Sequence, residues 1–278
     1  MKSPFASGVR TLGLSLASLL LISACGGTAS PTTHLDKIKS SGTLTVGIAI
    51  DPPFSLQDAS GKWYSFNPEL LSLLAQHLGL KIQYVPGTFA TIVAGLLASQ
   101  YDMIGASLSA TPERAKVVDF SIPYAYTGTV WLVRKDNPKH PASIADLNNS
   151  NVTIAVELGS AEEQRSRRLI PNAQYRALTG GPQRLAEVTS GHAQAVAETS
   201  FIVPALLQQF PELTAIPADV CPPGAGVCQG VEPSGVVWAV RKNDPEFLAA
   251  LNDFLQKATS DGTISKLAAA DLTAANTK

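Results

Sequence analysis

The sequence predicts an α/β fold with a parallel sheet, because short apolar runs alternate with helical patterns along the chain. Residues 44–50 form an apolar run that is typical of a buried strand. Asn67, Pro68 and Glu69 then predict the start of a helix, since Asn is a favoured N-cap, Pro fits the first turn and Glu suits the helix dipole. Gly79 is expected to end that helix. The first block continues with predicted strands at 82–85 and 103–108, a helix around 92–97 and a helix beginning at 111–113.

A second block repeats the alternation, with predicted strands at 152–156 and 193–197. Between these strands, Ser160 and Glu163 have the spacing of a capping box. Residues 130–138 (VWLVRKDNP) recur almost unchanged as residues 237–245 (VWAVRKNDP). Two similar extended segments that bracket a block indicate two strands connecting two lobes. Chance similarity between two strand ends is the alternative.

The first residues predict an export signal rather than part of the fold. Lys2 and Arg10 are followed by an apolar run at 11–22, which is too short to span a membrane. Ser23 and Ala24 precede Cys25 and resemble the lipobox of bacterial lipoproteins. That resemblance implies cleavage after residue 24 and diacylation of the Cys25 thiol, so residues 1–24 would be a signal peptide and 25–33 a lipid-anchored tether. An ordinary signal peptide with an incidental cysteine is the alternative.

Composition limits the remaining function classes. The chain has 278 residues, 45% hydrophobic and 15% charged, with a formal net charge of -1. It is therefore neither disordered nor basic enough to suggest a nucleic-acid partner. Outside the cytoplasm, Cys221 and Cys228 are expected to form a disulfide, with two free thiols as the alternative. The four histidines are scattered, so we expect no metal site.

Beyond the tether, the chain resembles the periplasmic solute-binding proteins of polar amino-acid ABC transporters (bacterial extracellular solute-binding proteins, family 3). The motifs that carry this resemblance occur in order over more than 200 residues: 51–54 (DPPF), 65–67 (SFN), 101–104 (YDMI), 109–115 (SATPERA), 118–124 (VDFSIPY) and 261–264 (DGTI). The resemblance implies a type II periplasmic binding protein fold with two α/β lobes joined by two hinge strands. Lobe 1 would comprise residues 34–130 and 233–278, and lobe 2 residues 131–232.

Arg114 is the central candidate binding residue. It lies in the first turn of a predicted helix, where free N–H groups and a guanidinium together suit a carboxylate. The resemblance implies that Arg114 binds the ligand α-carboxylate. A surface arginine paired with Glu113 or Asp119 is the alternative.

Other candidates surround the same carboxylate. Ser107 and Ser109 are two residues apart on a strand and are expected to face one side. The resemblance implies that their segment offers a carbonyl to the ligand ammonium and a hydroxyl to its carboxylate. It further implies that the Ala161 N–H, beside the cap at Ser160, reaches that carboxylate and that Phe66 packs on the ligand. A plain helix cap and a simple core aromatic are the alternatives for Ser160 and Phe66.

Departures from the family pattern bear on specificity. Asp51 stands where many relatives carry an aromatic residue, and Thr199 where many carry Asp. Its neighbour Glu198 can share the cleft with Thr199 only if the strand has ended there. With Glu157, three carboxylates are expected near the cleft. One would answer the α-ammonium and a second a cationic side chain. We therefore lean to a basic amino acid such as arginine, lysine or ornithine. Acids that are solvated or paired within the protein are the alternative.

The expected function is extracytoplasmic binding of an amino acid and its delivery to an ABC transporter permease by hinge closure. We expect a monomer, anchored to the cell membrane by lipid, with no cofactor and no enzymatic activity. One alternative is an enzyme similar to cyclohexadienyl dehydratase, with Glu198 or Asp51 as general acid. The other is a lipoprotein that senses a solute without serving a transporter.

Overall fold

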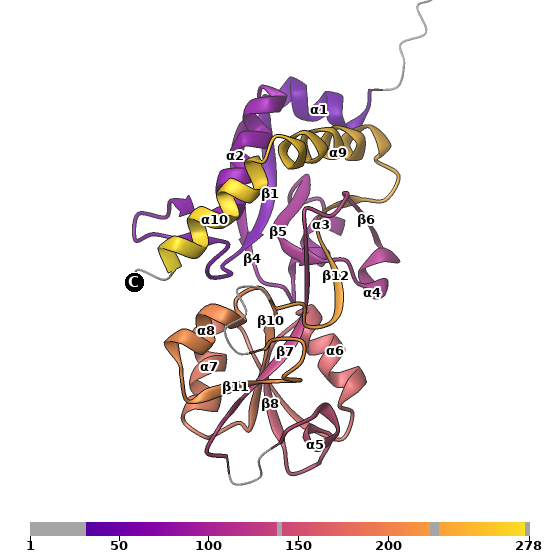
Figure 1. The fold of residues 1–278 in the computed structure, drawn as a ribbon. Coiled ribbons are helices and arrows are strands. Elements are labelled where there is room, and N and C mark those ends of the chain that lie inside the picture. The colour runs from indigo at the N-terminus through magenta and orange to yellow at the C-terminus, as the bar shows by residue number, and fades with distance from the viewer. Residues whose placement is uncertain (1–31, 138–140, 223–227, 276–278) are drawn as a thin grey trace, which may run out of the picture. The chain divides into compact units, whose positions relative to one another are not determined.

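The computed structural model describes residues 32–137, 141–222 and 228–275, and Thr33–Lys278 fold as one compact unit (Figure 1). The predicted signal peptide at 1–24, the lipidation site Cys25 and the tether up to residue 31 lie outside the described residues. Within the described ranges, no helix has the length and apolar character needed to cross a membrane.

One half of the main sheet has the strand order β4-β1-β5-β12. Strand β1 pairs in parallel with β4 and β5, whereas β12 runs antiparallel to β5. The strands of this half are β1 (Thr43–Ala49), β4 (Lys81–Gly87), β5 (Met103–Ser109), β6 (Val118–Phe120) and β12 (Val231–Arg241). Its helices are α1 (His34–Ser41), α2 (Phe66–Leu78), α3 (Ile92–Leu97), α4 (Pro112–Ala115), α9 (Pro245–Ser260) and α10 (Thr263–Ala275). A small ribbon of β2 (Leu56–Gln57) and β3 (Trp63–Tyr64) precedes α2. We call this set of elements the first lobe.

The other half has the order β9-β8-β10-β7, which repeats the arrangement of the first. Strand β8 pairs in parallel with β9 and β10, and β7 runs antiparallel to β10. Its strands are β7 (Ala125–Arg134), β8 (Thr153–Glu157), β9 (Gln174–Leu178), β10 (Ala195–Thr199) and β11 (Leu213–Ile216). Its helices are α5 (Ile144–Leu147), α6 (Ala161–Leu169), α7 (Gly181–Thr189) and α8 (Val203–Gln209). We call this set the second lobe.

Strands β7 and β12 connect the two lobes. They pair antiparallel with each other, from Ala125 opposite Val236 to Thr129 opposite Val231. Each strand then continues into the sheet of one lobe. The repeated segments found in the sequence form the far ends of these two strands. The predicted two-lobed α/β fold with two connecting strands is confirmed. The sheet is mixed rather than purely parallel, because the connecting strands enter each half antiparallel to their neighbours.

Each lobe has two apolar clusters, and one of the two contains the tryptophan of its repeated segment. Trp238 packs with helices α2 and α9 in the first lobe, and Trp131 packs with β8 and β10 in the second. Both side chains are fully buried. Trp131 Nε1 donates to Ser166 Oγ at 2.9 Å, whereas Trp238 Nε1 has no hydrogen-bond partner among the described residues. The repeat therefore places equivalent aromatic residues in two separate cores.

The expected N-cap at Asn67 is wrong. The helix begins two residues earlier, after an N-cap at Ser65 with a φ of 88°, and Ser65 makes no side-chain capping bond. Asn67 is instead fully buried, and its Nδ2 donates to the hydroxyls of Ser55 and Ser107, both at 2.8 Å. The amide joins three segments that are distant in sequence, and those tertiary hydrogen bonds outweigh its local capping preference.

The expected capping box is only half formed. Ser160 Oγ accepts from the Glu163 N–H at 3.0 Å, as the spacing predicts. Glu163 Oε2, however, accepts from the N–H of Gly159 at 2.7 Å, while the Ser160 N–H donates to the Glu157 carbonyl. The acid thus reaches past the cap and ties down the glycine turn that precedes α6.

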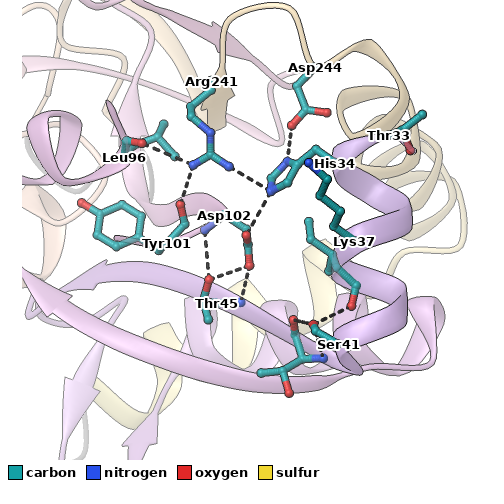
Figure 2. A network of polar contacts seen from close by, with 12 residues as sticks. Thr33, His34, Lys37, Ser41, Thr45, Leu96, Tyr101, Asp102, Arg241 and Asp244 are labelled. Atoms are coloured by element: carbon teal, nitrogen blue, oxygen red, sulfur yellow. Dashed lines mark hydrogen bonds and ion pairs between the residues drawn. The ribbon is translucent and has the colours of Figure 1, made fainter. Parts of the chain in front are cut away.

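A polar network fastens the start of α1 to the rest of the first lobe (Figure 2). His34 Nδ1 lies 2.5 Å from Asp244 Oδ2, and His34 Nε2 lies 3.1 Å from Asp102 Oδ1. Asp102 Oδ2 accepts from the Thr45 N–H at 2.8 Å, and Arg241 Nη1 donates to the Tyr101 carbonyl at 2.8 Å. The chain that follows the tether is therefore bound to β1, β5 and the start of α9.

Cys221 and Cys228 form the predicted disulfide. Both cysteines are buried in the core of the second lobe. The bond closes a loop whose residues 223–227 lie outside the described residues.

Candidate ligand-binding site

A cavity of about 650 Å³ is lined by residues of both lobes. Its volume is typical of small-molecule sites. All ten residues predicted to bind a ligand lie on its wall: Asp51, Phe66, Ser107, Ser109, Arg114, Glu157, Ser160, Ala161, Glu198 and Thr199. The structure thus brings the candidates together, and the role of each stays a prediction.

Arg114 is buried on the first-lobe side, with 6% of its surface exposed. Its Nη1 donates to the Ser109 carbonyl at 2.8 Å, and its Nη2 donates to the Gly159 carbonyl of the second lobe at 3.0 Å. No carboxylate of the described residues lies within 4 Å of the guanidinium, and Asp119 pairs with Lys242 instead. Burial lowers the pKa of Arg114 to about 10. This is a desolvated cation whose bonding groups are carbonyl dipoles, and it is not the surface arginine of the alternative interpretation.

The two serines reach the cavity by different backbone geometry. Strand β5 bulges between Ile104 and Leu108, opposite Val237 and Ala239, and within that bulge Ser107 has a φ of 45°. The expected simple alternation of Ser107 and Ser109 is therefore interrupted. Ser107 Oγ is fixed as an acceptor of the Asn67 amide at 2.8 Å.

Aromatic rings form the apolar wall of the first lobe. Phe66 stacks on Tyr124 with ring centroids 6.0 Å apart and meets Phe54 edge to face at 6.5 Å. Phe54 also contacts Phe201 of the second lobe, with centroids 5.1 Å apart. Phe66 is thus at once a core residue and a surface of the cavity.

Asp51 is the acid of the first-lobe wall. Its backbone forms a bridge with Ser55 through two hydrogen bonds of 2.9 Å, which holds the turn after β1. Burial, together with the nearby charge of Glu157, raises the pKa of Asp51 to about 8. A pKa of about 8 favours the protonated form of the Asp51 carboxyl near neutral pH.

The second lobe contributes a helix start to the wall. Ser160 caps α6, and Ala161 is its first residue, so the Ala161 N–H has no partner within the helix. Gly159 precedes the cap at φ 80°, and a Cβ there would lie 2.5 Å from the Ala90 backbone of the first lobe. The glycine allows the two lobes to approach closely beside Arg114.

Arg184 of α7 is the charged residue that the sequence interpretation missed. It is buried, with 7% exposed. Its Nη2 lies 3.1 Å from Glu157 Oε2 and 3.4 Å from Glu198 Oε2. Its spacing carries a signal, because Arg184 follows Pro182 as Arg114 follows Pro112. Two of the three predicted carboxylates are therefore paired within the protein, which matches the alternative for those two.

Burial controls the protonation of this charged group. It raises the pKa of Glu198 to about 7 and also raises that of Glu157, against the opposing charge of Arg184. Burial alone would lower the pKa of Arg184, but the charges of Glu198 and Glu157 outweigh it and raise that pKa. The arginine stays charged, and one of its partners titrates near neutrality.

Glu198 and Thr199 are the last two residues of β10 and both pair with β7, yet both line the cavity. The expectation that they could share it only after the strand had ended is therefore wrong. Thr199 Oγ1 also contacts Thr127 Oγ1 of the connecting strand β7. Glu162, half-buried on α6, is a further lining acid that the sequence interpretation did not single out. Among the described residues, no cluster of three or more His, Cys, Asp or Glu is placed to hold a metal ion.

Comparison with known proteins gives consistent matches. Residues 44–270 match the bacterial extracellular solute-binding proteins, family 3. The L-cystine-binding protein TcyJ of Escherichia coli K12 is 29% identical over 234 residues, covering 84% of each chain. The structure of AncCDT-1, an ancestral amino acid-binding protein described as a precursor of cyclohexadienyl dehydratase, is 35% identical with a TM-score of 0.73, covering 84% of this chain and 96% of that one. An ancestral arginine-binding protein bound to arginine is 30% identical with a TM-score of 0.69, covering 81% and 96%.

Proposed function

Because the chain belongs to family 3 of the bacterial extracellular solute-binding proteins, we propose that it binds an amino acid outside the cytoplasm and delivers it to an ABC transporter permease. The observation that carries this proposal is Arg114. It is a buried guanidinium on a cavity wall, with no carboxylate of the described residues beside it. A buried cation of this kind gains most from an anion supplied from outside.

The α-carboxylate of the ligand would lie between the lobes. Arg114 would hold it from the first lobe with its two-pronged guanidinium. The Ala161 N–H beside the Ser160 cap would meet it from the second lobe. Ser107 and Ser109 would add a carbonyl and a hydroxyl, Phe66 would pack on the ligand, and Asp51 would receive the α-ammonium.

The ligand side chain would be basic or polar. Glu157, Glu198 and Thr199 lie on the second-lobe wall and favour a side chain with hydrogen-bond donors. Relatives described as binding cystine or arginine support this range. Arg184, which lines the same wall, further restricts the range of side chains that fit.

Delivery would use closure of the two lobes around β7 and β12. We propose that lobe 1 comprises residues 34–130 and 233–278, and lobe 2 residues 131–232. A carboxylate held by both walls binds the closed state more tightly than the open one, and only such a difference shifts the equilibrium. The monomer would be tethered to the membrane through lipid on Cys25, after cleavage of residues 1–24, and would dock on the permease.

The test is a thermal-shift screen of the protein from residue 33 onward against the twenty amino acids, L-ornithine, L-citrulline and L-cystine, followed by calorimetry of those that stabilise it. At least one basic or polar amino acid is expected to raise the melting temperature and to bind with a stoichiometry of one. If no amino acid binds, the proposal fails. Mass spectrometry of the ligand that co-purifies gives an independent answer.

A dehydratase activity is the competing function, because AncCDT-1 is described as the precursor of such an enzyme. Glu198, a buried carboxyl with a pKa of about 7, would be the general acid. Incubation with prephenate or arogenate is expected to give no product. Turnover that Glu198→Gln abolishes would instead assign the enzyme.

A further inference from the structure

Arg184, Glu157 and Glu198 form a charged group in the second-lobe wall of the cavity, which we call the Arg184 cluster. Recognition of the α-carboxylate and α-ammonium in the proposed function does not use it. The arginine comes from α7, and its two acids come from the carboxyl ends of β8 and β10. All three residues line the cavity, so the cluster is available to a ligand side chain.

The hydrogen-bonding capacity of Arg184 is only partly used. Its Nη2 serves both carboxylates, and its Nη1 donates to the Ala197 carbonyl at 3.4 Å. Its Nε makes no hydrogen bond to any described residue, although the side chain is more than nine-tenths buried. A buried donor without a partner is unfavourable, so an acceptor oxygen from a ligand would stabilise the group.

The Arg184 guanidinium disfavours a cationic side chain at this place. It compensates one of its two carboxylates, and burial raises the pKa of Glu198 to about 7, so the second acid is partly protonated near neutral pH. A ligand guanidinium or ammonium beside Arg184 would then meet a like charge, which is costly in a buried site. A neutral group that has both a carbonyl oxygen and N–H donors avoids the like-charge contact and also supplies the acceptor that Arg184 lacks. Its oxygen accepts from Arg184, and its N–H groups donate to Glu157 or Glu198.

We propose that Arg184 is a specificity-determining residue of the binding site, which selects a ligand side chain ending in a neutral group with both an acceptor oxygen and N–H donors. This rests on the proposed function and narrows it. Carboxamide and ureido groups have this chemistry. The second amino-acid group of cystine has it too, because its ammonium and carboxylate together carry no net charge. Separate binding measurements with L-glutamine, L-citrulline and L-cystine distinguish these three end groups.

The decisive measurement compares L-citrulline with L-arginine by calorimetry. The two ligands differ only in the end group, which is a neutral urea in one and a cationic guanidinium in the other. The wild-type protein is expected to bind citrulline about tenfold more tightly or better, since a site built for an acceptor discriminates against a ligand that lacks it. In Arg184→Leu the order is expected to reverse, because two unpaired carboxylates then face the ligand.

A second variant keeps the test decisive if Arg184→Leu does not fold. Glu198→Gln retains Arg184 but removes one neutralising charge, and the citrulline-to-arginine affinity ratio is expected to rise about threefold or more. Arg176→Leu is the matched control, because Arg176 lies on β9 with 53% of its side chain exposed, and the ratio is expected to stay unchanged.

The outcomes separate this inference from the proposed function. Tighter binding of arginine by the wild type, or a ratio that Arg184→Leu and Glu198→Gln leave unchanged, overturns the role of Arg184 while amino-acid binding stands. Failure of every amino acid to bind overturns both.

Discussion

Each lobe presents one arginine to the cavity from the same local sequence pattern, yet the two arginines have opposite surroundings. Arg114 and Arg184 both stand two residues after a proline in the first turn of a helix. Arg114 donates to the carbonyls of Ser109 and Gly159 and has no carboxylate within 4 Å among the described residues. Arg184 lies between two glutamates.

The difference separates two uses of a buried cation. Arg184 is neutralised from within, so its charge is already compensated when the cavity is empty. Arg114 donates only to carbonyl dipoles, and the charges of Glu162 and Glu113 act on it from beyond 4 Å, so its compensation is incomplete until an anion arrives. We therefore expect Arg114 to supply affinity and Arg184 to supply selectivity.

Arg114→Ala is expected to have the largest effect. It removes two charge-assisted hydrogen bonds to the ligand carboxylate, and the loss in affinity should be about 100-fold or more. Calorimetry with the amino acid found in the screen measures it. Arg168→Ala, at an arginine exposed on α6 and paired with Glu232, should leave affinity unchanged. Equal affinities for Arg114→Ala and wild type would contradict the proposal that Arg114 binds the ligand carboxylate.

Gly159→Ala tests the close approach of the lobes beside Arg114. The substitution strains a backbone at φ 80° and drives a Cβ into the Ala90 backbone, which displaces the carbonyl that accepts from Arg114. We expect about tenfold weaker binding, equivalent to about 1.4 kcal/mol, because the clash displaces a carbonyl beside the bound carboxylate. The strain of the left-handed conformation, about 1–2 kcal/mol, should instead lower stability.

Gly191→Ala is the matched control, since Gly191 has the same φ of 80° with nothing within 4 Å of the added Cβ. It should lower stability without changing affinity. Equal losses of affinity in both variants would show that backbone strain, rather than contact between the lobes, is responsible.

The acid of the first-lobe wall should make binding depend on pH. Asp51 has a pKa of about 8 in the empty cavity against 3.8 ordinarily, so between these values the folded protein holds a proton that the unfolded chain has released. Stability of the empty protein should therefore fall as pH rises through this window. A ligand ammonium favours the ionised acid and expels the proton, so affinity should rise towards pH 8, by at most about tenfold per unit.

Asp51→Asn should flatten both pH profiles, measured by calorimetry and thermal unfolding between pH 6 and 8. Asp58→Asn serves as the control, because Asp58 is exposed and its pKa lies below the ordinary value. Glu198, with a pKa of about 7, adds a residual slope of the same sign in the stability profile. An unchanged pH profile in Asp51→Asn would place the titrating group elsewhere in the cavity.

Local sequence patterns predicted elements well and tertiary pairings poorly. Strands β1, β4, β5, β8 and β10, the terminating Gly79 and the ten cavity residues follow from apolar runs and family motifs, which depend on neighbouring residues. Strands β9 and β11, which lack a clear apolar run, were not predicted. Arg184 carried a visible signal in its spacing from Pro182, but its pairing depends on how α7, β8 and β10 meet, which no local pattern specifies. Asn67 was assigned to a cap for the same reason, since its partners Ser55 and Ser107 become neighbours only in the fold.

The tryptophans of the repeated segments allow the two cores to be compared by one equivalent substitution in each, with the smallest expected effect. Trp131→Phe removes the hydrogen bond from Nε1 to Ser166 Oγ and leaves that buried hydroxyl short of a donor, whereas Trp238→Phe removes an N–H that has no partner among the described residues. Both substitutions leave similar small voids, so the loss of unfolding free energy should be larger for Trp131→Phe by about 1 kcal/mol. Urea unfolding monitored by circular dichroism measures the two losses. Equal losses would mean that Trp238 Nε1 is as well satisfied as Trp131 Nε1, and that the two cores do not differ in this respect.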